Sequence, residues 1–446
     1  MNENEETRGM YHTITYGCQM NEHDSEKLAG VLEEDGYTPT EDIEKADVII
    51  INTCCVRENA ELKVFGKVGS LKQYKRQNPE LIIGICGCMM QQEEIVQEIK
   101  EKYSHVDIVF GTHNIHRFPE LLAEARQFQN PLIEVWEQEK GLIPELPAKR
   151  ESDYQAWTTI VYGCDNFCSY CIVPYVRGRE RSRPVENILK EVRELSSEGI
   201  KEITLLGQNV NSYGKDLSEN IDFADLLQEL NKVDGIERIR YMTSHPRDFN
   251  QKLIETIADT EKVCEHIHLP MQSGSSKILK EMKRGYNQEE YLELVKEIRE
   301  AMPEVAISTD FIVGFPGESE ADFQETLKVV KEVKFDMAYT FLYSQRSGTP
   351  AAKLEEQIPK HIKKERLERL MDLQSQISQE QNEKLVGKTL EVLVEGESKK
   401  DSSKLTGRSR SNKIVIFSGD SNLTGELINV NINKAQSWTL FGSLIE

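Results

Sequence analysis

The stretch Cys164-Asp-Asn-Phe-Cys168-Ser-Tyr-Cys171 places three cysteines on one short loop in a C-x₃-C-x₂-C pattern. Three thiolates spaced in this way can hold three irons of a 4Fe–4S cube. No fourth cysteine or histidine follows closely in the sequence, so one iron would stay open to bind another group. A zinc site or a set of reduced structural cysteines is the alternative, but zinc sites favour four ligands in paired C-x₂₋₄-C hooks. The loop therefore favours an iron–sulfur cluster with one open iron.

The cysteine loop lies near the start of a long α/β segment, residues 154–345. Short apolar stretches alternate there with amphipathic helices such as 185–195, 223–230, 288–301 and 321–333. This alternation predicts parallel strands joined by helices, with a site at the carboxyl ends of the strands. We expect a partial or complete (βα)6 barrel with strands at 157–162, 201–206, 237–242, 264–268, 305–313 and 337–342.

A long charged helix is expected after this barrel, at 359–383. Its apolar residues recur at helical spacing, which favours packing against the barrel over a coiled coil with a partner. These residues are Ile362, Leu367, Leu370, Met371, Leu373 and Ile377.

The first 127 residues also alternate between apolar strands and amphipathic helices. Strands are expected at 12–16, 48–52, 81–85 and 106–110, and helices at 22–35, 56–75, 90–102 and 116–127. This pattern is typical of a small doubly wound α/β domain. Prolines among mixed charges then indicate a linker at 128–149, through Pro131, Pro144 and Pro147.

From Gly387 onward the apolar residues recur with a period of two. Five short strands at 389–394, 405–410, 413–417, 425–432 and 437–441 predict a small OB-like β-barrel. Basic residues slightly outnumber acidic ones here, and several cluster early: Lys399, Lys400, Lys404, Arg408, Arg410 and Lys413. A solvated barrel face is the simpler interpretation. The reversed charge balance favours RNA binding, for which Lys404, Arg408 and Arg410 are the candidates.

The whole chain thus divides into an α/β domain at 9–127, a linker at 128–149, a barrel with its connecting helix at 150–382 and a β-barrel at 383–446. It has 446 residues, 38% hydrophobic and 29% charged, which is typical of a globular protein. Residues 1–9 lack the features of a signal peptide, and no apolar run approaches the ~20 residues that span a bilayer. We expect a cytoplasmic protein whose nine cysteines stay reduced. A net charge of −21 excludes indiscriminate nucleic-acid binding but not a specific RNA partner.

A second group of cysteines follows the strands of the N-terminal domain. Cys18 follows the first expected strand, Cys54 the second and Cys88 the third. Loops at the carboxyl ends of an open α/β sheet converge on one crevice, so these three thiols point to a second cluster. The alternative is that they are small buried hydrophobes. Spacing leaves open the choice between Cys54 and Cys55, and between Cys88 and Cys86, although Cys86 and Cys264 fit a core position better.

Several motifs together resemble the methylthiotransferase family of radical S-adenosylmethionine (SAM) enzymes. They are Thr15-Tyr-Gly-Cys18-Gln-Met-Asn21, Ile51-Asn-Thr-Cys54-Cys-Val-Arg-Glu58, Gly87-Cys88-Met89 and the C-x₃-C-x₂-C loop. The resemblance covers nearly the whole chain and implies a terminal TRAM domain that binds RNA. It also implies two 4Fe–4S clusters, an auxiliary one on Cys18, Cys54 and Cys88 and a radical-SAM one on Cys164, Cys168 and Cys171.

Within the family, Gly17-Cys-Gln-Met-Asn21 and residues 162–180 most resemble enzymes that act on N6-isopentenyladenosine at position 37 of tRNA, beside the anticodon. Relatives that modify threonylcarbamoyl-adenosine or a ribosomal protein differ after the first cysteine. The resemblance implies that SAM binds the open iron of the radical cluster, and that the 5′-deoxyadenosyl radical made from it removes hydrogen from the adenine C-2 carbon. A methylthio group from the auxiliary cluster would replace that hydrogen.

SAM contacts are expected at the ends of later barrel strands, from Gln208, Gln272 and Asp310, although each could also be a polar residue that caps a loop. Arg177, Arg179, Arg181 and Arg183 follow the cysteine loop with a period of two. They could pair with nearby acids, but we favour contact with the anticodon backbone, above all from Arg177 and Arg179.

The expected partners are tRNA, a low-potential electron donor and a sulfur supply, with the chain acting as a monomer. Two rival functions remain: a carrier of iron–sulfur clusters, or a redox sensor that binds RNA.

Overall fold

A computed structural model describes residues 8–55, 58–128, 130–138 and 145–445. It divides into two compact units, which are described separately. The first contains Met1–Glu151, Tyr162–Asp165 and Ile172–Glu180, and the second contains Ser152–Val161, Asn166–Cys171 and Arg181–Glu446. The short strands β8 (Val161–Tyr162) and β9 (Arg181–Ser182) lie where the chain passes from one unit to the other. Residues 1–7, on which the signal-peptide prediction rests, and Pro144 of the expected linker lie outside the described residues.

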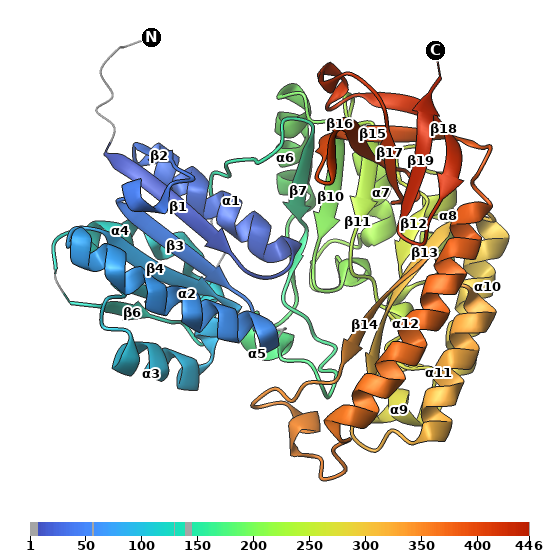
Figure 1. Cartoon of the computed structure of the whole chain (residues 1–446), viewed down its shortest axis with the longest axis horizontal. Helices are drawn as coiled ribbons and strands as arrows, with labels where there is room; N and C mark the ends of the chain where they lie inside the picture. Colours follow the sequence, from blue (N-terminus) through green and yellow to red (C-terminus); the bar gives the residue numbers. More distant parts are fainter. Residues whose placement is uncertain (1–7, 56–57, 129, 139–144, 446) are drawn as a thin grey trace. The chain divides into compact units, whose positions relative to one another are not determined.

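The first unit is built on a six-stranded parallel sheet with the order β2-β1-β3-β4-β5-β6 (Figure 1). This order reverses between β1 and β3, which is the switch point of a doubly wound fold. The strands are β1 (Gly9–Thr15), β2 (Tyr37–Pro39), β3 (Val48–Thr53), β4 (Ile82–Gly87), β5 (Ile108–Phe110) and β6 (Leu132–Glu134).

Helices cover both faces of this sheet, because the central strands are apolar on both sides. Ile49 and Ile51 of β3 pack in one core with helices α2 (Glu58–Gln77) and α3 (Glu93–Lys102). Ile50 packs in the other core with α1 (Gln19–Glu34) and α4 (Phe118–Ala125). A continuous apolar run is typical of a parallel strand that is buried on both faces. The doubly wound prediction is therefore confirmed.

Two edge strands were not expected from the sequence. Strand β2 lies beside β1, and β6 lies beside β5 with Ile108 opposite Leu132. Strand β6 lies inside the segment 128–149, which the sequence analysis predicted to be a linker. Each edge strand has only three residues, which is too short for a periodic pattern to show.

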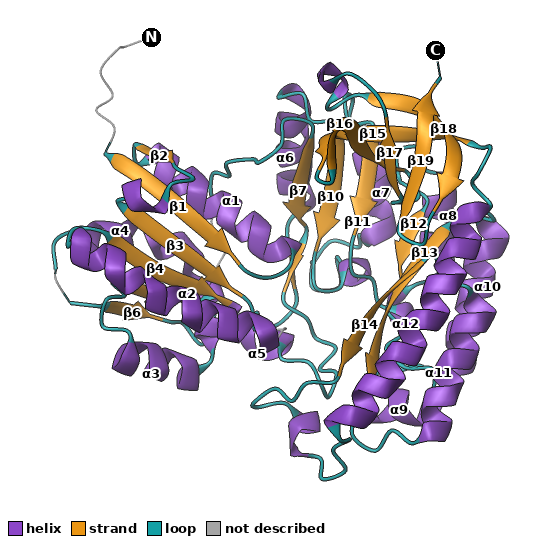
Figure 2. Cartoon of the chain, viewed as in Figure 1, coloured by secondary structure: helices purple, strands orange, loops and turns teal. Residues whose placement is uncertain are grey.

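The second unit contains six parallel strands in two three-stranded sheets, β7-β10-β11 and β12-β13-β14 (Figure 2). A single parallel bridge between Ile239 and Val263 connects them. The strands are β7 (Gln155–Thr159), β10 (Glu202–Leu206), β11 (Arg238–Tyr241), β12 (His266–His268), β13 (Ala306–Val313) and β14 (Met337–Leu342). The helices are α6 (Val185–Ser197), α7 (Phe223–Asn231), α8 (Gln251–Asp259), α9 (Ser276–Glu281), α10 (Gln288–Ala301) and α11 (Glu320–Val333). This arrangement is the expected partial (βα)6 barrel.

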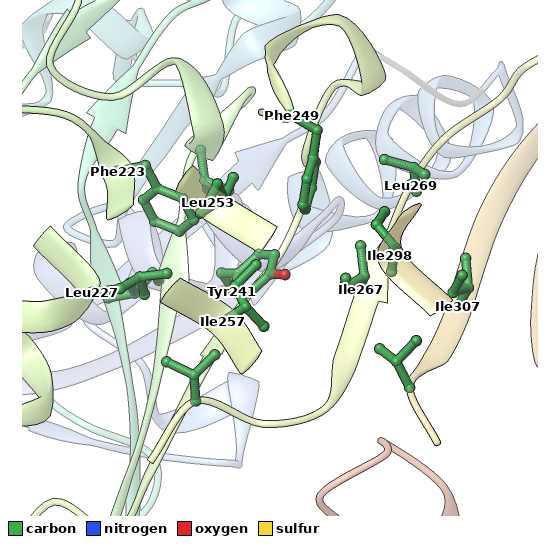
Figure 3. Packing of buried hydrophobic residues seen from close by; sticks show 14 of the residues in the cluster. Phe223, Leu227, Tyr241, Phe249, Leu253, Ile257, Ile267, Leu269, Ile298 and Ile307 are labelled. Carbon is green, nitrogen blue, oxygen red and sulfur yellow. The ribbon is translucent and has the colours of Figure 1, made fainter. Parts of the chain in front are cut away.

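Large side chains from strands and helices fill the core of this barrel (Figure 3). Phe223 of α7 lies edge-on to Tyr241 of β11, with ring centroids 5.4 Å apart. Helix α12 (Lys360–Glu383) contributes Leu370 and Ile377 to the same core. The long charged helix therefore packs against the barrel, as the helical spacing of its apolar residues predicts.

The chain ends in a closed barrel of five strands with the order β15-β16-β17-β19-β18. They are β15 (Thr389–Ser398), β16 (Asp401–Ser409), β17 (Ile414–Phe417), β18 (Leu427–Ala435) and β19 (Thr439–Leu444). Val392, Leu405 and Val415 are among the residues of its small core. The predicted fold class, with its OB-like C-terminal barrel, is confirmed.

Two buried arginines join this small barrel to β11 within the second unit. The Arg238 guanidinium is fully buried and donates to the Glu391 carboxylate at 2.7 Å and to the Arg408 carbonyl at 2.9 Å. The Arg240 guanidinium donates to the carbonyls of Ser409 and Arg410 at 2.8 and 2.9 Å. Buried carbonyls that receive charge-assisted hydrogen bonds make a specific contact.

Among the described residues, no helix has the length and apolar character needed to cross a membrane.

Candidate functional site

The three N-terminal candidate cysteines lie at the carboxyl end of the first unit's sheet. Cys18 precedes α1 directly after β1, and Cys54 follows β3. Cys88 begins the short 3₁₀ helix Cys88–Gln91 directly after β4. Strands β1 and β3 are neighbours, and the switch point between them is where doubly wound folds bind their ligands.

Two glycines allow the loops that carry these cysteines to pack closely. Gly17 has a φ of +145°, and a Cβ atom there would lie 2.9 Å from the Cβ atom of Cys54. Gly87 has a φ of +98°, and a Cβ atom there would lie 2.4 Å from the carbonyl oxygen of Thr53. A side chain at either position would push two of the cysteine loops apart.

A pair of buried asparagines ties the loop after β1 to the end of β3. Asn21 Nδ2 donates to Asn52 Oδ1 at 3.1 Å and to the Thr53 carbonyl at 2.9 Å. Asn52 Nδ2 donates back to the Asn21 carbonyl at 2.8 Å. The Cys18 thiol lies 3.4 Å from Asn21 Oδ1. These contacts give a physical role to both asparagines of the sequence motifs.

Cys54 and Cys55 are both buried, but they have different neighbours. Cys54 lies against Gly17, whereas the thiol of Cys55 hydrogen-bonds to Cys88. That hydrogen bond lowers the pKa of Cys88 to about 6. Burial acts in the opposite direction, and the positive charge of Arg177 lowers this pKa further. Cys86 lies within β4, where burial raises the pKa of its thiol well above the usual value, as suits a core cysteine.

Arg177 is the charged partner of this group, and it is only 6% exposed. Its Nε donates to Cys88 Sγ at 3.2 Å, and its Nη2 donates to Asp24 Oδ2 at 2.9 Å and to Asn21 Oδ1 at 3.3 Å. Burial disfavours the guanidinium charge, but Cys88, Asp24 and Cys18 raise the pKa of Arg177 well above its usual value.

The local fold holds Arg177 in this position. It follows the short helix α5 (Val173–Val176), and Val176 packs in the core that also contains Cys88. Thr112 Oγ1 donates to the Val176 carbonyl at 2.6 Å. A buried cation that donates to a thiol suits a cluster held by thiolates, because such a cluster carries net negative charge. The side chains present therefore fit a 4Fe–4S cluster.

No three His, Cys, Asp or Glu side chains in the described parts of the chain converge as ligands of a single metal ion. Each thiolate of a 4Fe–4S cluster binds a different iron, so its ligands need not converge in that way.

Hydrogen bonds surround the three cysteines of the C-x₃-C-x₂-C loop. In the first unit, the Cys164 amide donates to the Gly178 carbonyl at 3.1 Å. In the second unit, the Cys171 amide donates to the Cys168 carbonyl at 3.0 Å, and Ser169 Oγ donates to the Glu281 carbonyl at 2.7 Å. These hydrogen bonds fix the backbone on which the thiols are presented.

A second buried arginine contacts this loop within the second unit. Arg284 Nη1 donates to Cys168 Sγ at 3.3 Å, and Nη2 donates to the Pro270 carbonyl at 3.0 Å. Its Nε donates to the hydroxyl of Tyr286 at 3.0 Å. Arg284, which lies between α9 and α10 and is buried, thus holds Cys168, as Arg177 holds Cys88 in the first unit.

The candidate SAM residues all lie in the second unit. Gln208 follows β10, and Gln272, at a φ of +75°, follows β12. The Gln272 amide donates to the Asp310 carbonyl at 2.8 Å, so two of the three candidates are adjacent. Asp310 lies inside β13 rather than after it, and its carboxylate is 3.5 Å from His268 Nε2.

The candidate RNA contacts differ in how far their side chains are exposed. Arg179 is 71% exposed and pairs with Asp165 at 3.3 Å, and Lys404 is half-buried. Arg408 pairs with Glu395 at 2.9 Å, whereas Arg410 donates to Glu265. Arg177 is enclosed by its contacts with Cys88 and Asp24, as described above.

Two features of the site were missed in the sequence analysis. Arg284 is an isolated arginine more than a hundred residues after Cys168, and no spacing rule connects them. The buried chain His266–Ser308–His268 has both imidazoles 2.9 Å from the Ser308 hydroxyl. The alternation of His266 and His268 along β12 was a usable signal, since it places both on one face of the strand.

Comparison with known proteins defines the class first. Residues 158–330 match the Radical SAM superfamily, residues 10–111 match the uncharacterized protein family UPF0004, and residues 383–445 match the TRAM domain. The solved structure of the radical S-adenosylmethionine methyltransferase TsrM from Kitasatospora setae, with cobalamin and a [4Fe-4S] cluster bound, is similar with a TM-score of 0.56. It is 13% identical, and the match covers 77% of each chain. At that identity the likeness concerns the fold alone.

Two full-length relatives define the family. A tRNA-2-methylthio-N(6)-dimethylallyladenosine synthase of Thermoanaerobacter pseudethanolicus is 58% identical over 445 residues, which cover 99% of this chain and 94% of the relative. A protein of the same name from Alkaliphilus oremlandii is 58% identical over 436 residues, which cover 98% and 93%. The chain belongs to this family of radical SAM methylthiotransferases. The predicted family and its cofactors, 4Fe–4S clusters and SAM, are thereby confirmed.

Proposed function

We propose that the chain inserts a methylthio group at the adenine C-2 carbon of N6-isopentenyladenosine at position 37 of tRNA. The product would be 2-methylthio-N6-isopentenyladenosine, which agrees with the name that its relatives carry. The TRAM match adds an RNA-binding element at the C-terminus.

One observation carries this proposal. Cysteines follow three neighbouring strands at the switch point of the first unit's sheet, and a buried arginine donates to one of them. The chain also has the separate C-x₃-C-x₂-C loop. An enzyme that both makes a radical and supplies sulfur needs two such sites, whereas a radical enzyme without sulfur transfer needs one.

In this proposal Cys18, Cys54 and Cys88 hold the auxiliary cluster, and Cys164, Cys168 and Cys171 hold the radical-SAM cluster. When bound, the clusters and SAM supply the 5′-deoxyadenosyl radical and the sulfur, which are beyond the reach of ordinary side chains. The protein's own part is to orient the thiolates, keep their surroundings dry and bind the tRNA. Arg284 and Arg177 hold the thiolates Cys168 and Cys88 in position.

Other residues are proposed to bind the substrates. Gln208, Gln272 and Asp310 would contact SAM. For the tRNA backbone we favour Arg179 in the first unit, and Lys404 and Arg408 on the small barrel of the second unit. Arg177 and Arg410 are the remaining two candidates, but their side chains are only 7% and 25% exposed. We further propose a cytoplasmic monomer that takes electrons from a low-potential donor and sulfur from a cellular supply system.

An anaerobic assay tests the function. Reconstituted protein receives SAM, a reductant and tRNA bearing isopentenyladenosine, threonylcarbamoyl-adenosine or neither modification, and the digested nucleosides are analysed by mass spectrometry. We expect 5′-deoxyadenosine, S-adenosylhomocysteine and the methylthio nucleoside only with the isopentenyladenosine tRNA. Formation of 5′-deoxyadenosine without that nucleoside would move the substrate to threonylcarbamoyl-adenosine or to a ribosomal protein. Neither product, from protein that holds both clusters, would favour a cluster carrier or a redox sensor.

A further inference from the structure

We propose that Arg177 and Asp24 together set the reduction potential of the auxiliary cluster, with opposite signs. Arg177 is a positioning residue here, since it acts on the cluster through the thiolate of Cys88. The proposal rests on the assignment of Cys18, Cys54 and Cys88 as cluster ligands under the proposed function.

The contacts of Arg177 leave its guanidinium little freedom. Nε is directed at Cys88 Sγ at 3.2 Å, while Nη2 is shared between Asp24 at 2.9 Å and Asn21 at 3.3 Å. Asp24 lies one turn of α1 beyond Asn21, so both acceptors come from the same helix. The planar guanidinium can meet these directions at once, which a lysine cannot do.

Burial makes these charges effective. The side chains of Arg177 and Asp24 are 7% and 11% exposed, so water screens neither of them well. Electrostatic interactions are stronger in such surroundings than at a wet surface. A surface ion pair would contribute little, as measured pairs of that kind show.

The direction of each effect follows from charge. Reduction adds an electron to a cluster, so a nearby positive charge and a hydrogen bond to a ligand sulfur favour the reduced form. Arg177 therefore raises the reduction potential. Asp24 opposes it, because its carboxylate partly cancels the charge of Arg177. Removing the two groups one at a time must shift the potential in opposite directions.

Arg177 is close in sequence to the other cluster loop. Arg177 lies in the segment Ile172–Glu180, which directly follows Cys171 and belongs to the first unit. An arginine in this segment that contacted only RNA would have no reason to be enclosed by Cys88 and Asp24. Its placement is therefore explained by the auxiliary cluster.

The experiment uses the full chain with Cys164, Cys168 and Cys171 all changed to Ala, so that only the auxiliary cluster can form. Iron content is measured first, and the midpoint potential is then determined by a redox titration followed by electron paramagnetic resonance. We expect Arg177→Gln to shift the midpoint to a more negative value and Asp24→Asn to shift it to a more positive one. Arg177→Lys keeps the positive charge but loses the planar guanidinium that reaches Cys88 and Asp24 together. Its midpoint therefore shifts to a more negative value, by less than that of Arg177→Gln.

Arg117→Gln is the matched control, because Arg117 pairs with Glu134 elsewhere in the same unit and at 36% side-chain exposure. It removes one positive charge and leaves the midpoint unchanged. Shifts of Arg177→Gln and Asp24→Asn in the same direction would indicate a loosened site, and no shift in either would show that the charges are ineffective. Both results overturn the proposal.

Two further outcomes keep the tests separate. If the protein with only Cys164, Cys168 and Cys171 changed to Ala holds no iron, the ligand assignment of the proposed function is wrong. The inference about Arg177 and Asp24 is then wrong too. If only Arg177→Gln fails to hold iron, Asp24→Asn decides: a more positive midpoint supports the proposal and an unchanged or more negative one overturns it.

Discussion

The guanidinium of Arg410 forms two hydrogen bonds to the carboxylate of Glu265. Nε donates to Oε2 and Nη2 donates to Oε1, each at 2.8 Å. Nη2 also donates to the carbonyls of Glu261 and Val263 at 2.8 Å. Arg410 follows β16 of the small barrel, and Glu265 directly precedes β12 of the large one. A residue that the sequence suggested for RNA contact therefore joins two parts of the second unit.

The first prediction separates these two roles of Arg410. If it acts by docking the small barrel, Arg410→Ala and Glu265→Ala weaken tRNA binding by similar factors. A double-mutant cycle on unfolding then gives a coupling of about 1 kcal/mol, since the pair is partly exposed. Filter binding and urea unfolding measure the two quantities. Weaker tRNA binding in Arg410→Ala alone would instead mean that Arg410 contacts RNA directly.

The second prediction concerns the adjacent cysteines. Cys54→Ala leaves SAM cleavage intact but stops sulfur insertion, because the auxiliary cluster loses a ligand. Cys55→Ala, the matched control, retains sulfur insertion. Cys168→Ala abolishes 5′-deoxyadenosine formation. The products are quantified by mass spectrometry, and the opposite behaviour of Cys54→Ala and Cys55→Ala would assign the ligand to Cys55.

The third prediction tests the close packing of the cysteine loops. In Gly87→Ala the new methyl group meets the Thr53 carbonyl at 2.4 Å and Asn52 Oδ1 at 2.5 Å, and the backbone conformation, with φ +98° and ψ −169°, adds a cost of about 1–3 kcal/mol. The loop that carries Cys88 must move, so the iron content of reconstituted protein falls by about half as one of two clusters is lost. Gly66→Ala is the control, since no atom lies within 4 Å of a Cβ atom placed there. Full iron content in Gly87→Ala would show that the loop tolerates the displacement.

The fourth prediction is a pH dependence that originates at His245. Burial, with help from the positive charge of Arg284, lowers the pKa of His245 from 6.5 to about 2. The folded protein therefore keeps this imidazole neutral, while the unfolded chain takes up a proton below pH 6.5. Stability from this group is complete above pH 6.5 and is lost as the pH falls, at about 1.4 kcal/mol per pH unit.

The variant His245→Gln removes that titration. The urea midpoints of the variant and the parent are measured at about pH 7.5 and about pH 5.5. The difference between the two midpoints is expected to be smaller at the lower pH. A difference that stays constant across this range would mean that His245 titrates alike in the folded and unfolded chain.

Much of the architecture could be predicted because its signals are local. The apolar run of β3 and the period of two after Gly387 arise from burial within one strand, so they are visible in the sequence. The positions of Cys18, Cys54 and Cys88 were predictable for the same reason, since each lies within three residues of the end of a strand. The edge strands β2 and β6 lack such a pattern, because three residues are too few for a period to show.

The partners of the arginines could not be predicted. Arg177 and Arg179 belong to the same period-two run of arginines after the cysteine loop, yet one is enclosed by Cys88 and Asp24 and the other is exposed. Arg410 looks like any basic residue of an RNA-binding surface until its contact with Glu265 is seen. Such contacts join residues far apart in the chain, and neither charge nor periodicity encodes them.

The central claim is that a radical replaces the hydrogen on the adenine C-2 carbon with a methylthio group. Its most direct test uses tRNA whose isopentenyladenosine carries deuterium at C-2, with the intact protein, SAM and a reductant under anaerobic conditions. We predict that the deuterium appears in 5′-deoxyadenosine and that the methylthio nucleoside forms in step with it. Methylthio nucleoside accompanied by unlabelled 5′-deoxyadenosine would contradict this account.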